Sequence, residues 1–153
     1  LIAHFGIGIL LLGITASSIW QNEKIVTMKI NDVIEVNKNK IVFSKISEVK
    51  QKNYLALRGN FVVYNDHQEI ISELMPENRF YPTTKIITTE ASIHTNFARD
   101  LYIVLGDGTL DNGWVVKIYY NPLVLWIWIG AITIFFGGII SISSNLKKIK
   151  NHF

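Results

Sequence analysis

The residue most able to do chemistry is His4, which stands in the otherwise almost wholly apolar run LIAHFGIGILLLGITASSIW (residues 1–20). An ionisable side chain inside a membrane-spanning helix is costly, so it usually faces a protein interior, a cofactor or a water-filled cavity. Gly8 lies one helical turn further on, and Gly6 and Gly13 add small surfaces that a flat ligand or another helix can approach closely. Three interpretations stay open: a ligand or proton-relay role, a hydrogen bond to a neighbouring helix, and an apparent burial that arises only because the chain begins nearby.

The other three histidines carry weaker signals. His67 lies in a predicted turn, YNDHQE, and His152 lies in the basic tail. His94 stands in the middle of the polar region, but no second histidine or carboxylate lies at a metal-ligand spacing from it. We therefore expect all three to be solvated surface residues.

The segment PENRFYPTT (residues 76–84) is the densest unusual stretch of the polar region. Arg79 could bind a carboxylate or a propionate through two parallel hydrogen bonds, and Tyr81 could stack or donate. The favoured interpretation is structural: an irregular edge segment with Phe80 and Tyr81 packed inward. Glu90, Arg99 and Asp100 could form a charge network, but such a network does not require a function.

Catalytic patterns are absent from the sequence. It contains no Cys, which excludes thiol catalysis, Cys-based metal sites and a thiol–disulfide role. It also contains no phosphate-binding glycine loop and no justified Ser-His-Asp arrangement.

The elements that must position these residues follow from the two apolar ends. Neither Leu1–Trp20 nor Pro122–Ser144 contains Asp, Glu, Lys or Arg, and each can cross a hydrocarbon core of about 30 Å as a helix. We predict a transmembrane helix over 1–20, an exported β domain over 21–121, a transmembrane helix over 122–144 and a basic tail over 145–153. The sequence starts within an apolar run and has neither an initiator Met nor a basic leader. We therefore expect a piece of a longer protein rather than a signal peptide.

The net charge of +3 comes from the tail. Acidic and basic residues balance between residues 21 and 121, and the excess is carried by Lys147, Lys148 and Lys150. Basic residues next to a membrane helix mark the cytoplasmic or matrix side, so the middle domain is expected on the opposite side. The basic pI therefore gives no reason to expect nucleic-acid binding.

Between the two ends the periodicity changes to alternation, which is typical of half-buried strands. One face of GWVVKIYY carries Trp114, Val116, Ile118 and Tyr120, and one face of DLYIVL carries Leu101, Ile103 and Leu105. Turn residues separate such runs, for example at Asn31-Asp32, Gly106-Asp107-Gly108 and Asp111-Asn112-Gly113. The predicted fold class is two transmembrane helices flanking an exported all-β domain, either a small sandwich or an OB-like barrel. Tyr119, Tyr120, Trp126 and Trp128 are expected to form an aromatic belt at the membrane interface.

Six motifs together resemble the C-terminal part of the CcmF family of cytochrome c haem lyase subunits. They are AHFGIGILLLGIT, NYLALRGNF, PENRFYP, TTEASI, RDLYIVLGD and IYYNPLVLWIWIGA, in this order along the chain. The resemblance covers essentially the whole chain. It departs from the family at Phe5, where Leu is usual, and in lacking the Trp-rich haem-handling motif.

The resemblance implies a role in attaching haem covalently to apocytochrome c. It implies that His4 is an axial ligand of the iron of a haem b in the membrane, whose second ligand lies upstream. Our mechanistic hypothesis is that this haem passes electrons to the substrate haem and keeps its iron reduced. The implied partners are the remainder of the haem lyase polypeptide, a haem chaperone, and apocytochrome c with its thiol-handling subunit. No catalytic residue is implied, and none is assigned to Arg79, Tyr81 or Arg99.

The implied location is the bacterial inner membrane with the β domain in the periplasm, or the mitochondrial inner membrane with this domain in the intermembrane space. Without the Trp-rich region this chain alone cannot be the lyase. The alternative function is a non-catalytic membrane adapter whose β domain docks other subunits. A transporter fragment is disfavoured because the chain has two spans and no further intramembrane charge.

Overall fold

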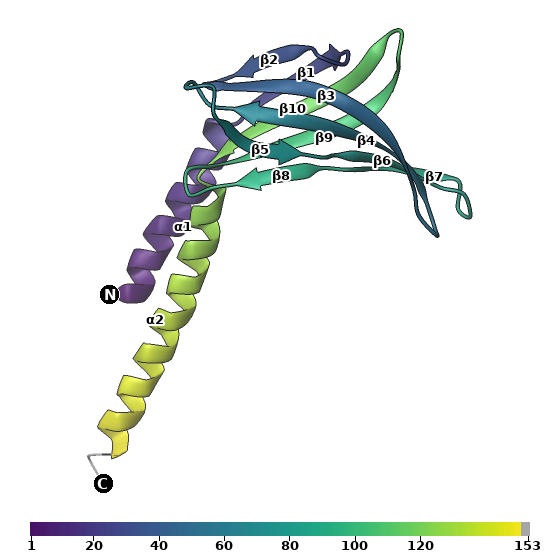
Figure 1. Cartoon of the computed structure of the whole chain (residues 1–153). Helices are drawn as coiled ribbons and strands as arrows, with labels where there is room; N and C mark the ends of the chain where they lie inside the picture. Colours follow the sequence, from purple (N-terminus) through teal and green to yellow (C-terminus); the bar gives the residue numbers. More distant parts are fainter. Residues whose placement is uncertain (151–153) are drawn as a thin grey trace. The chain divides into compact units, whose positions relative to one another are not determined.

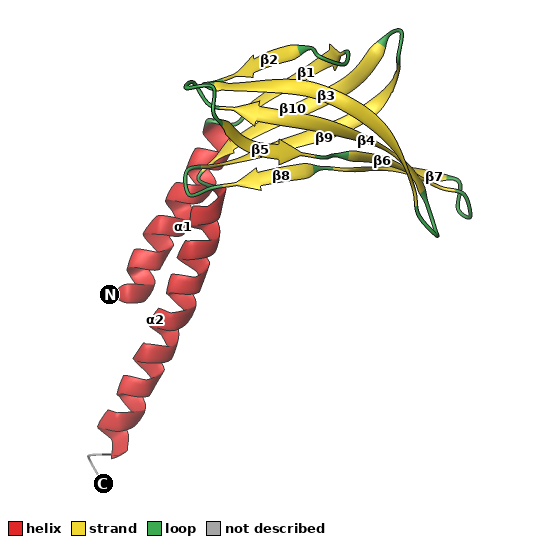
Figure 2. Cartoon of the chain, viewed as in Figure 1, coloured by secondary structure: helices red, strands yellow, loops and turns green. Residues whose placement is uncertain are grey.

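The structure is a computed structural model that describes residues 1–150, with the side chains of residues 1–143. The chain divides into two compact units. The helical unit comprises Leu1–Gln21, Thr95–Asp100 and the chain from Asn121 onward, and the β unit comprises Asn22–His94 and Leu101–Tyr120. Figure 2 shows which parts of the chain are helix and which are strand.

The strands form two antiparallel sheets that pack as a sandwich (Figure 1). One sheet has the order β1-β10-β9-β8, and the other has the order β2-β3-β4-β6-β7 with β5 also paired to β4. The strands are β1 (Asn22–Met28), β2 (Val33–Val36), β3 (Asn39–Lys50), β4 (Leu55–Tyr64), β5 (Ile70–Leu74), β6 (Glu77–Tyr81), β7 (Ile86–Glu90), β8 (Ser92–Thr95), β9 (Arg99–Thr109) and β10 (Gly113–Pro122). The all-β prediction is confirmed, in its sandwich form.

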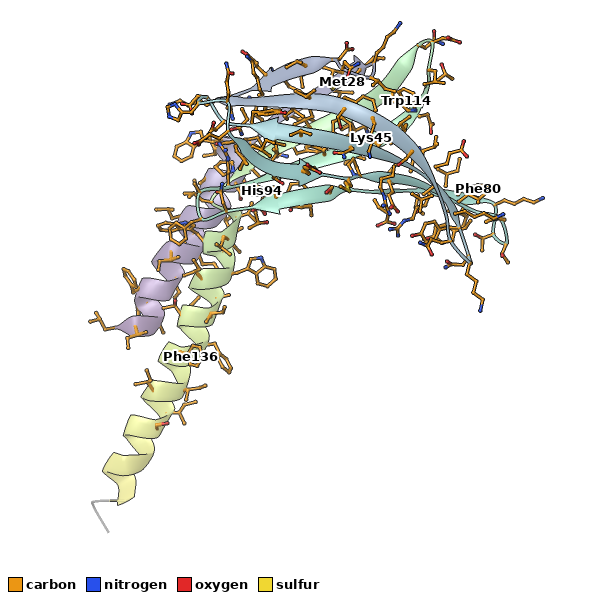
Figure 3. All side chains as sticks on the ribbon, viewed as in Figure 1. Met28, Lys45, Phe80, His94, Trp114 and Phe136 are labelled. Carbon is orange, nitrogen blue, oxygen red and sulfur yellow. The ribbon has the colours of Figure 1, made fainter. Side chains whose placement is uncertain are left out.

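The core lies between the two sheets and has the alternation expected from the sequence. Every second residue of β9 and β10 is buried there: Leu101, Ile103, Leu105, Trp114, Val116 and Ile118. From the other sheet, Phe43 and Phe61 stack with ring centroids 4.5 Å apart, and Trp114 meets Phe43 edge-on at 5.7 Å. Met28 and Trp114, labelled in Figure 3, are both buried and stand opposite each other in the β1–β10 register. Aromatic contacts of this geometry add to the area that each ring buries.

One predicted turn is wrong. Gly106, Asp107 and Gly108 lie inside β9, which continues to Thr109 before the chain reverses towards Gly113. A Cβ at Gly106 would stand 3.0 Å from the Val115 oxygen of the neighbouring strand, so this glycine permits close pairing rather than a reversal. The turn ends at Gly113, whose φ of +83° explains the need for glycine there.

The segment that contains Arg79 is also more regular than predicted. β6 pairs with β4 on one side and with β7 on the other, so it is not an edge strand. Phe80 and Tyr81 point to opposite faces of the sheet because neighbouring residues alternate, and Phe80 remains 39 % exposed. Figure 3 shows Phe80 at the part of the sheet where β6 and β7 lie. Phe80 pairs with Leu55 and so lies on the core-side face, whereas Tyr81 lies on the other face. The prediction that both rings pack inward is therefore wrong for Tyr81.

The helical unit contains α1 (Ile2–Ile19) and α2 (Val124–Lys150). Both helices include a stretch that is long and apolar enough to cross a membrane, Ile2–Ile19 and Val124–Ser143. α2 begins two residues later than predicted, because Pro122 still belongs to β10 and Leu123 takes a left-handed conformation with φ of 56°. The predicted basic tail begins within α2, and its last residues, 151–153, lie outside the described part.

Candidate functional site

The two helices pack antiparallel through small residues. Gly6 and Gly13 of α1 face Ile134 and Ile127 of α2, and an added Cβ at either glycine would stand 2.8 Å from the facing backbone nitrogen. On α2, a Cβ at Gly130 would stand 2.6 Å from the backbone nitrogen of Leu10. Glycines at a helix contact allow two backbones to approach closely, which is how apolar helices associate where burial against lipid gives little gain. These contacts fix which face of α1 is turned towards α2.

His4 lies on the opposite face of α1. The contact residues follow the spacing Ala3, Gly6, Leu10 and Gly13, whereas His4 shares its face with residues four, seven and eleven positions further on. These residues are Gly8, Leu11 and Thr15, and all of them are exposed in this chain, as His4 is. A Cβ at Gly8 would meet no atom within 4 Å. The imidazole is therefore directed away from α2, which removes α2 as its hydrogen-bonding partner.

No metal cluster surrounds this histidine within the part of the chain that the structure describes. Three or more His, Asp or Glu side chains do not converge anywhere among those residues. His67 is 79 % exposed in its turn and stands 3.7 Å from Asp66, as expected for a surface residue. His94 is half-buried on β8, and His152 lies outside the described residues. The other ligands of a metal held by His4 would have to come from outside the described residues.

The Arg79 segment forms a closed ion-pair cluster on β4, β6 and β7. Arg58 and Arg79 both donate from Nε to the carboxylate of Glu77, each at 2.7 Å. Arg79 also stands 3.6 Å from Glu90 and lies over the Tyr54 ring at 4.6 Å. The two guanidiniums are thus directed at the chain's own carboxylates. This geometry supports the structural interpretation of Arg79 rather than the binding of an external carboxylate.

The electrostatics of this cluster centre on Glu77, whose side chain is 7 % exposed. Burial opposes ionisation of Glu77, but hydrogen bonds from Arg79 and Arg58 outweigh it and hold the pKa of this carboxyl below its usual range. The hydrogen bond to Glu77 in turn raises the pKa of the Arg79 guanidinium. Both shifts favour the charged forms of Glu77 and Arg79.

A groove of about 650 Å³ lies on the β unit beside the end of β9. Its lining includes Leu55 and Leu57 of β4, Phe80 of β6 and Ile87 of β7. At its margin Asn78 donates from Nδ2 to Asp107 at 3.0 Å. Leu55 and Leu57 stand on the same face of β4 as the core residue Phe61, so the groove extends the inner surface of the sandwich.

The four residues of the predicted aromatic belt are divided between the two units. Trp126 and Trp128 stand in the first turns of α2, but Tyr119 and Tyr120 belong to the β unit. Tyr120 packs against the sandwich core, and a hydrogen bond with Glu23, together with burial, raises the pKa of the Tyr119 phenol. A residue that the sequence did not point to, Phe97, instead contacts Trp126 with ring centroids 5.3 Å apart.

Comparison with known proteins identifies the family. Residues 19–122 match the family described as the CcmF C-terminal beta-sandwich. This chain belongs to the CcmF family. The match extends from the end of α1 to the end of β10, so it includes the whole β unit.

Curated CcmF relatives extend the similarity over both helices. The chain is 35 % identical over 148 residues to the cytochrome c-type biogenesis protein CycK of Rhizobium meliloti, covering 97 % of this chain and 22 % of that protein. It is 31 % identical over 140 residues to the cytochrome c-type biogenesis protein CcmF of Haemophilus influenzae, covering 92 % and 22 %. A solved structure of the cytochrome c heme lyase CcmF matches with a TM-score of 0.70 at 17 % identity, covering 90 % of this chain and 23 % of that chain. The chain thus spans about a fifth of the length of these CcmF proteins.

Proposed function

We propose that this chain is the C-terminal segment of a haem lyase subunit in cytochrome c maturation, in which His4 supplies one axial ligand to a haem b in the membrane. The observation that carries the proposal is the position of His4. Its imidazole is exposed on the face turned away from α2, in a helix with no other ionisable side chain. An ionisable group in such a place needs a partner, and neutral imidazole is a good haem ligand.

The residues around His4 fit a flat ligand. A macrocycle ligated through an imidazole lies beside the helix and needs clearance about one turn away along the same face. Gly8 occupies that position, and open space surrounds it. A bound haem would supply one-electron chemistry, and its second ligand would come from the remainder of the parent protein. The role of His4 is to present a lone pair to the iron.

The contact between the helices restrains the direction in which the His4 side chain projects. Because Gly6, Gly13 and Gly130 hold α1 against α2 on the opposite side, rotation of α1 about its axis is restrained. The direction in which His4 projects is restrained with it. Restraint of this kind is what a metal ligand needs from the protein around it.

The β unit has a docking role in this proposal, on the exported side of the membrane. Its acidic and basic residues balance, whereas Lys147, Lys148 and Lys150 follow the second span. Basic residues there favour retention of that end on the cytoplasmic or matrix side. The β unit would then meet the haem chaperone and apocytochrome c in the periplasm or the intermembrane space.

The test is the haem content of the full-length protein that contains this chain. We expect His4→Ala to lose most of the b haem in a pyridine haemochrome assay, because one of two axial ligands is removed. His67→Ala is the matched control, since this histidine is 79 % exposed in a turn, and it should retain the wild-type stoichiometry. His4→Gly should regain haem when imidazole is added, which a packing role would not produce.

Normal haem content in purified His4→Ala protein would contradict the proposal. The chain would then be better described by the alternative function, a membrane adapter without a cofactor ligand. Loss of haem without rescue by imidazole, in protein that remains folded by circular dichroism, would indicate that His4 acts through packing.

A further inference from the structure

A short turn between β8 and β9 belongs to the helical unit rather than to the sandwich. Residues Thr95–Asp100 group with the two helices by their contacts, although the strands on both sides are part of a sheet. The turn contains Phe97, whose ring is 63 % exposed and contacts the ring of Trp126 on α2. An exposed phenylalanine held in a defined position beside a membrane-spanning helix requires an explanation.

Two hydrogen bonds fasten this turn to the start of α2. The indole Nε1 of Trp126 donates to the Phe97 oxygen at 3.0 Å. The backbone nitrogen of Leu123, just before the helix begins, donates to the Ala98 oxygen at 2.9 Å. These bonds join residues that lie more than twenty positions apart in the chain, so the turn and the helix start form one structural piece.

The turn also satisfies many of its own polar groups. The Asn96 side-chain oxygen accepts hydrogen bonds from the Ala98 and Arg99 nitrogens, both at 2.9 Å. The Asn96 nitrogen donates to the Arg99 oxygen at 2.9 Å. With the two bonds to α2, three amides and three carbonyls of the turn have protein partners. Backbone can approach hydrocarbon only when its polar groups are satisfied in this way, whereas a turn in water has no such requirement.

Other aromatic residues stand at the same end of the antiparallel helix pair. Trp20 follows the last residue of α1 and is 67 % exposed, and Trp128 on α2 is 66 % exposed. Tryptophan and other amphipathic rings are enriched at the level of the lipid headgroups. Phe97 thus contacts α2 close to the end of the helix pair at which these exposed indole rings stand.

We propose that the Asn96–Arg99 turn is a membrane anchor, with Phe97 inserted among phospholipids at the boundary between headgroups and acyl chains. The binding partner is the lipid bilayer, and the segment that contacts it is the turn between β8 and β9. The turn holds Phe97 beside Trp126, so that insertion of the ring and the position of the α2 start are coupled. This inference does not depend on haem ligation by His4.

The test places a nitroxide spin label at Phe97→Cys in the full-length protein, with any other cysteines removed, in phosphatidylcholine nanodiscs. Power-saturation EPR compares collisions of the label with oxygen, which concentrates in lipid, and with a water-soluble nickel chelate. The water control is Leu110→Cys, because Leu110 is 71 % exposed in the turn between β9 and β10. The lipid control is Ile132→Cys, because Ile132 is 55 % exposed within the second span.

We expect the ratio of oxygen to nickel collisions at position 97 to exceed the ratio at position 110 several-fold and to approach the ratio at position 132. A ratio equal to that at position 110 would place Phe97 in water and overturn the proposal. Low collision rates with both reagents, together with an immobilised spectrum, would mean that another part of the parent protein covers Phe97, and would overturn it as well.

A second variant tests the coupling to α2. Trp126→Phe keeps an aromatic ring beside position 97 but removes the indole donor to the main-chain oxygen of that residue. In the Phe97→Cys background this change should increase the mobility of the label and lower its collision ratio towards that of position 110. An unchanged spectrum would show that the indole hydrogen bond does not hold the turn in place.

Discussion

Glu77 is the centre of the ion-pair cluster on β4 and β6, and its role is structural. It is a buried carboxylate that accepts hydrogen bonds from two arginines, one on β4 and one beside it on β6. Removing one member of such a group leaves charges without their partner in a partly desolvated place, which costs more than the group contributes when complete. Arg58 and Arg79 are partly exposed, so solvent reduces this cost.

Replacing Glu77 by Gln should therefore destabilise the β unit by about 1–3 kcal/mol at neutral pH. The pH dependence should change as well. Because the pKa of Glu77 is lowered in the folded chain, its contribution to stability is complete above the ordinary value of 4.5 and is lost as the pH falls through the lower, folded value. Thermal unfolding of the chain in detergent, followed by near-ultraviolet circular dichroism from pH 7 to pH 3, measures both effects.

Glu73→Gln is the matched control for this experiment, because Glu73 is exposed on β5. It should leave both the stability at pH 7 and its decline in acid close to the wild type. Glu77→Gln should instead show the smaller decline below pH 4.5, since the group that titrates has been removed. Parallel pH profiles for wild type and Glu77→Gln would contradict the assignment of the acid sensitivity to this carboxylate.

At the scale of elements, the helix pair depends on glycines that face the partner helix. A Cβ at Gly130 would stand 2.6 Å from the Leu10 backbone, whereas a Cβ at Gly138 would meet nothing within 4 Å. Alanine is favoured over glycine in a helix by about 1 kcal/mol. Replacing Gly130 or Gly138 by Ala is the same chemical change at both positions. The two sites differ in that the added methyl group meets α1 at position 130 and open space at position 138.

We expect Gly130→Ala to lower the thermal unfolding midpoint of the chain in detergent, because α1 and α2 must separate to admit the methyl group. Gly138→Ala should leave the midpoint unchanged or raise it slightly, as helix propensity predicts. Far-ultraviolet circular dichroism during heating provides the measurement. If both variants shifted the midpoint in the same direction by the same amount, the close packing of the helices would not be a source of stability.

Elements could be predicted from the sequence where the pattern is local. The alternation of Trp114, Val116 and Ile118 reports directly which face of β10 is buried, because side chains alternate across a strand. The two candidate membrane spans can be predicted in the same way, because length and apolar composition alone define them.

Contacts between distant parts of the chain could not be predicted in this way. The Gly106–Gly108 segment has turn composition, but pairing with β10 keeps it extended. The bond from Trp126 to Phe97 joins residues 29 positions apart and leaves no local pattern. The sequence is enough to identify His4 as a candidate. The face of α1 on which His4 lies depends on the glycine contacts with α2, which no local pattern predicts.

At the scale of the whole molecule, charge provides the argument for orientation. The β unit carries no excess charge, so its own residues favour neither side of the membrane, and the orientation depends on Lys147, Lys148 and Lys150 after the second span. Two spans place both chain ends on one side. The prediction is that residue 110, in the turn between β9 and β10, is on the side opposite to residue 148.

Cysteine labelling in whole spheroplasts or mitoplasts measures this directly, because the chain contains no cysteine of its own. A membrane-impermeant maleimide should label Leu110→Cys in intact preparations, since Leu110 is 71 % exposed. Lys148→Cys is the opposite control and should react only after the membrane is permeabilised. Replacing the other two lysines, Lys147 and Lys150, by Gln should make labelling at position 110 less complete, because the charge bias that retains the tail is weakened. Labelling of both cysteines from the same side would show that the apolar ends do not form two complete spans.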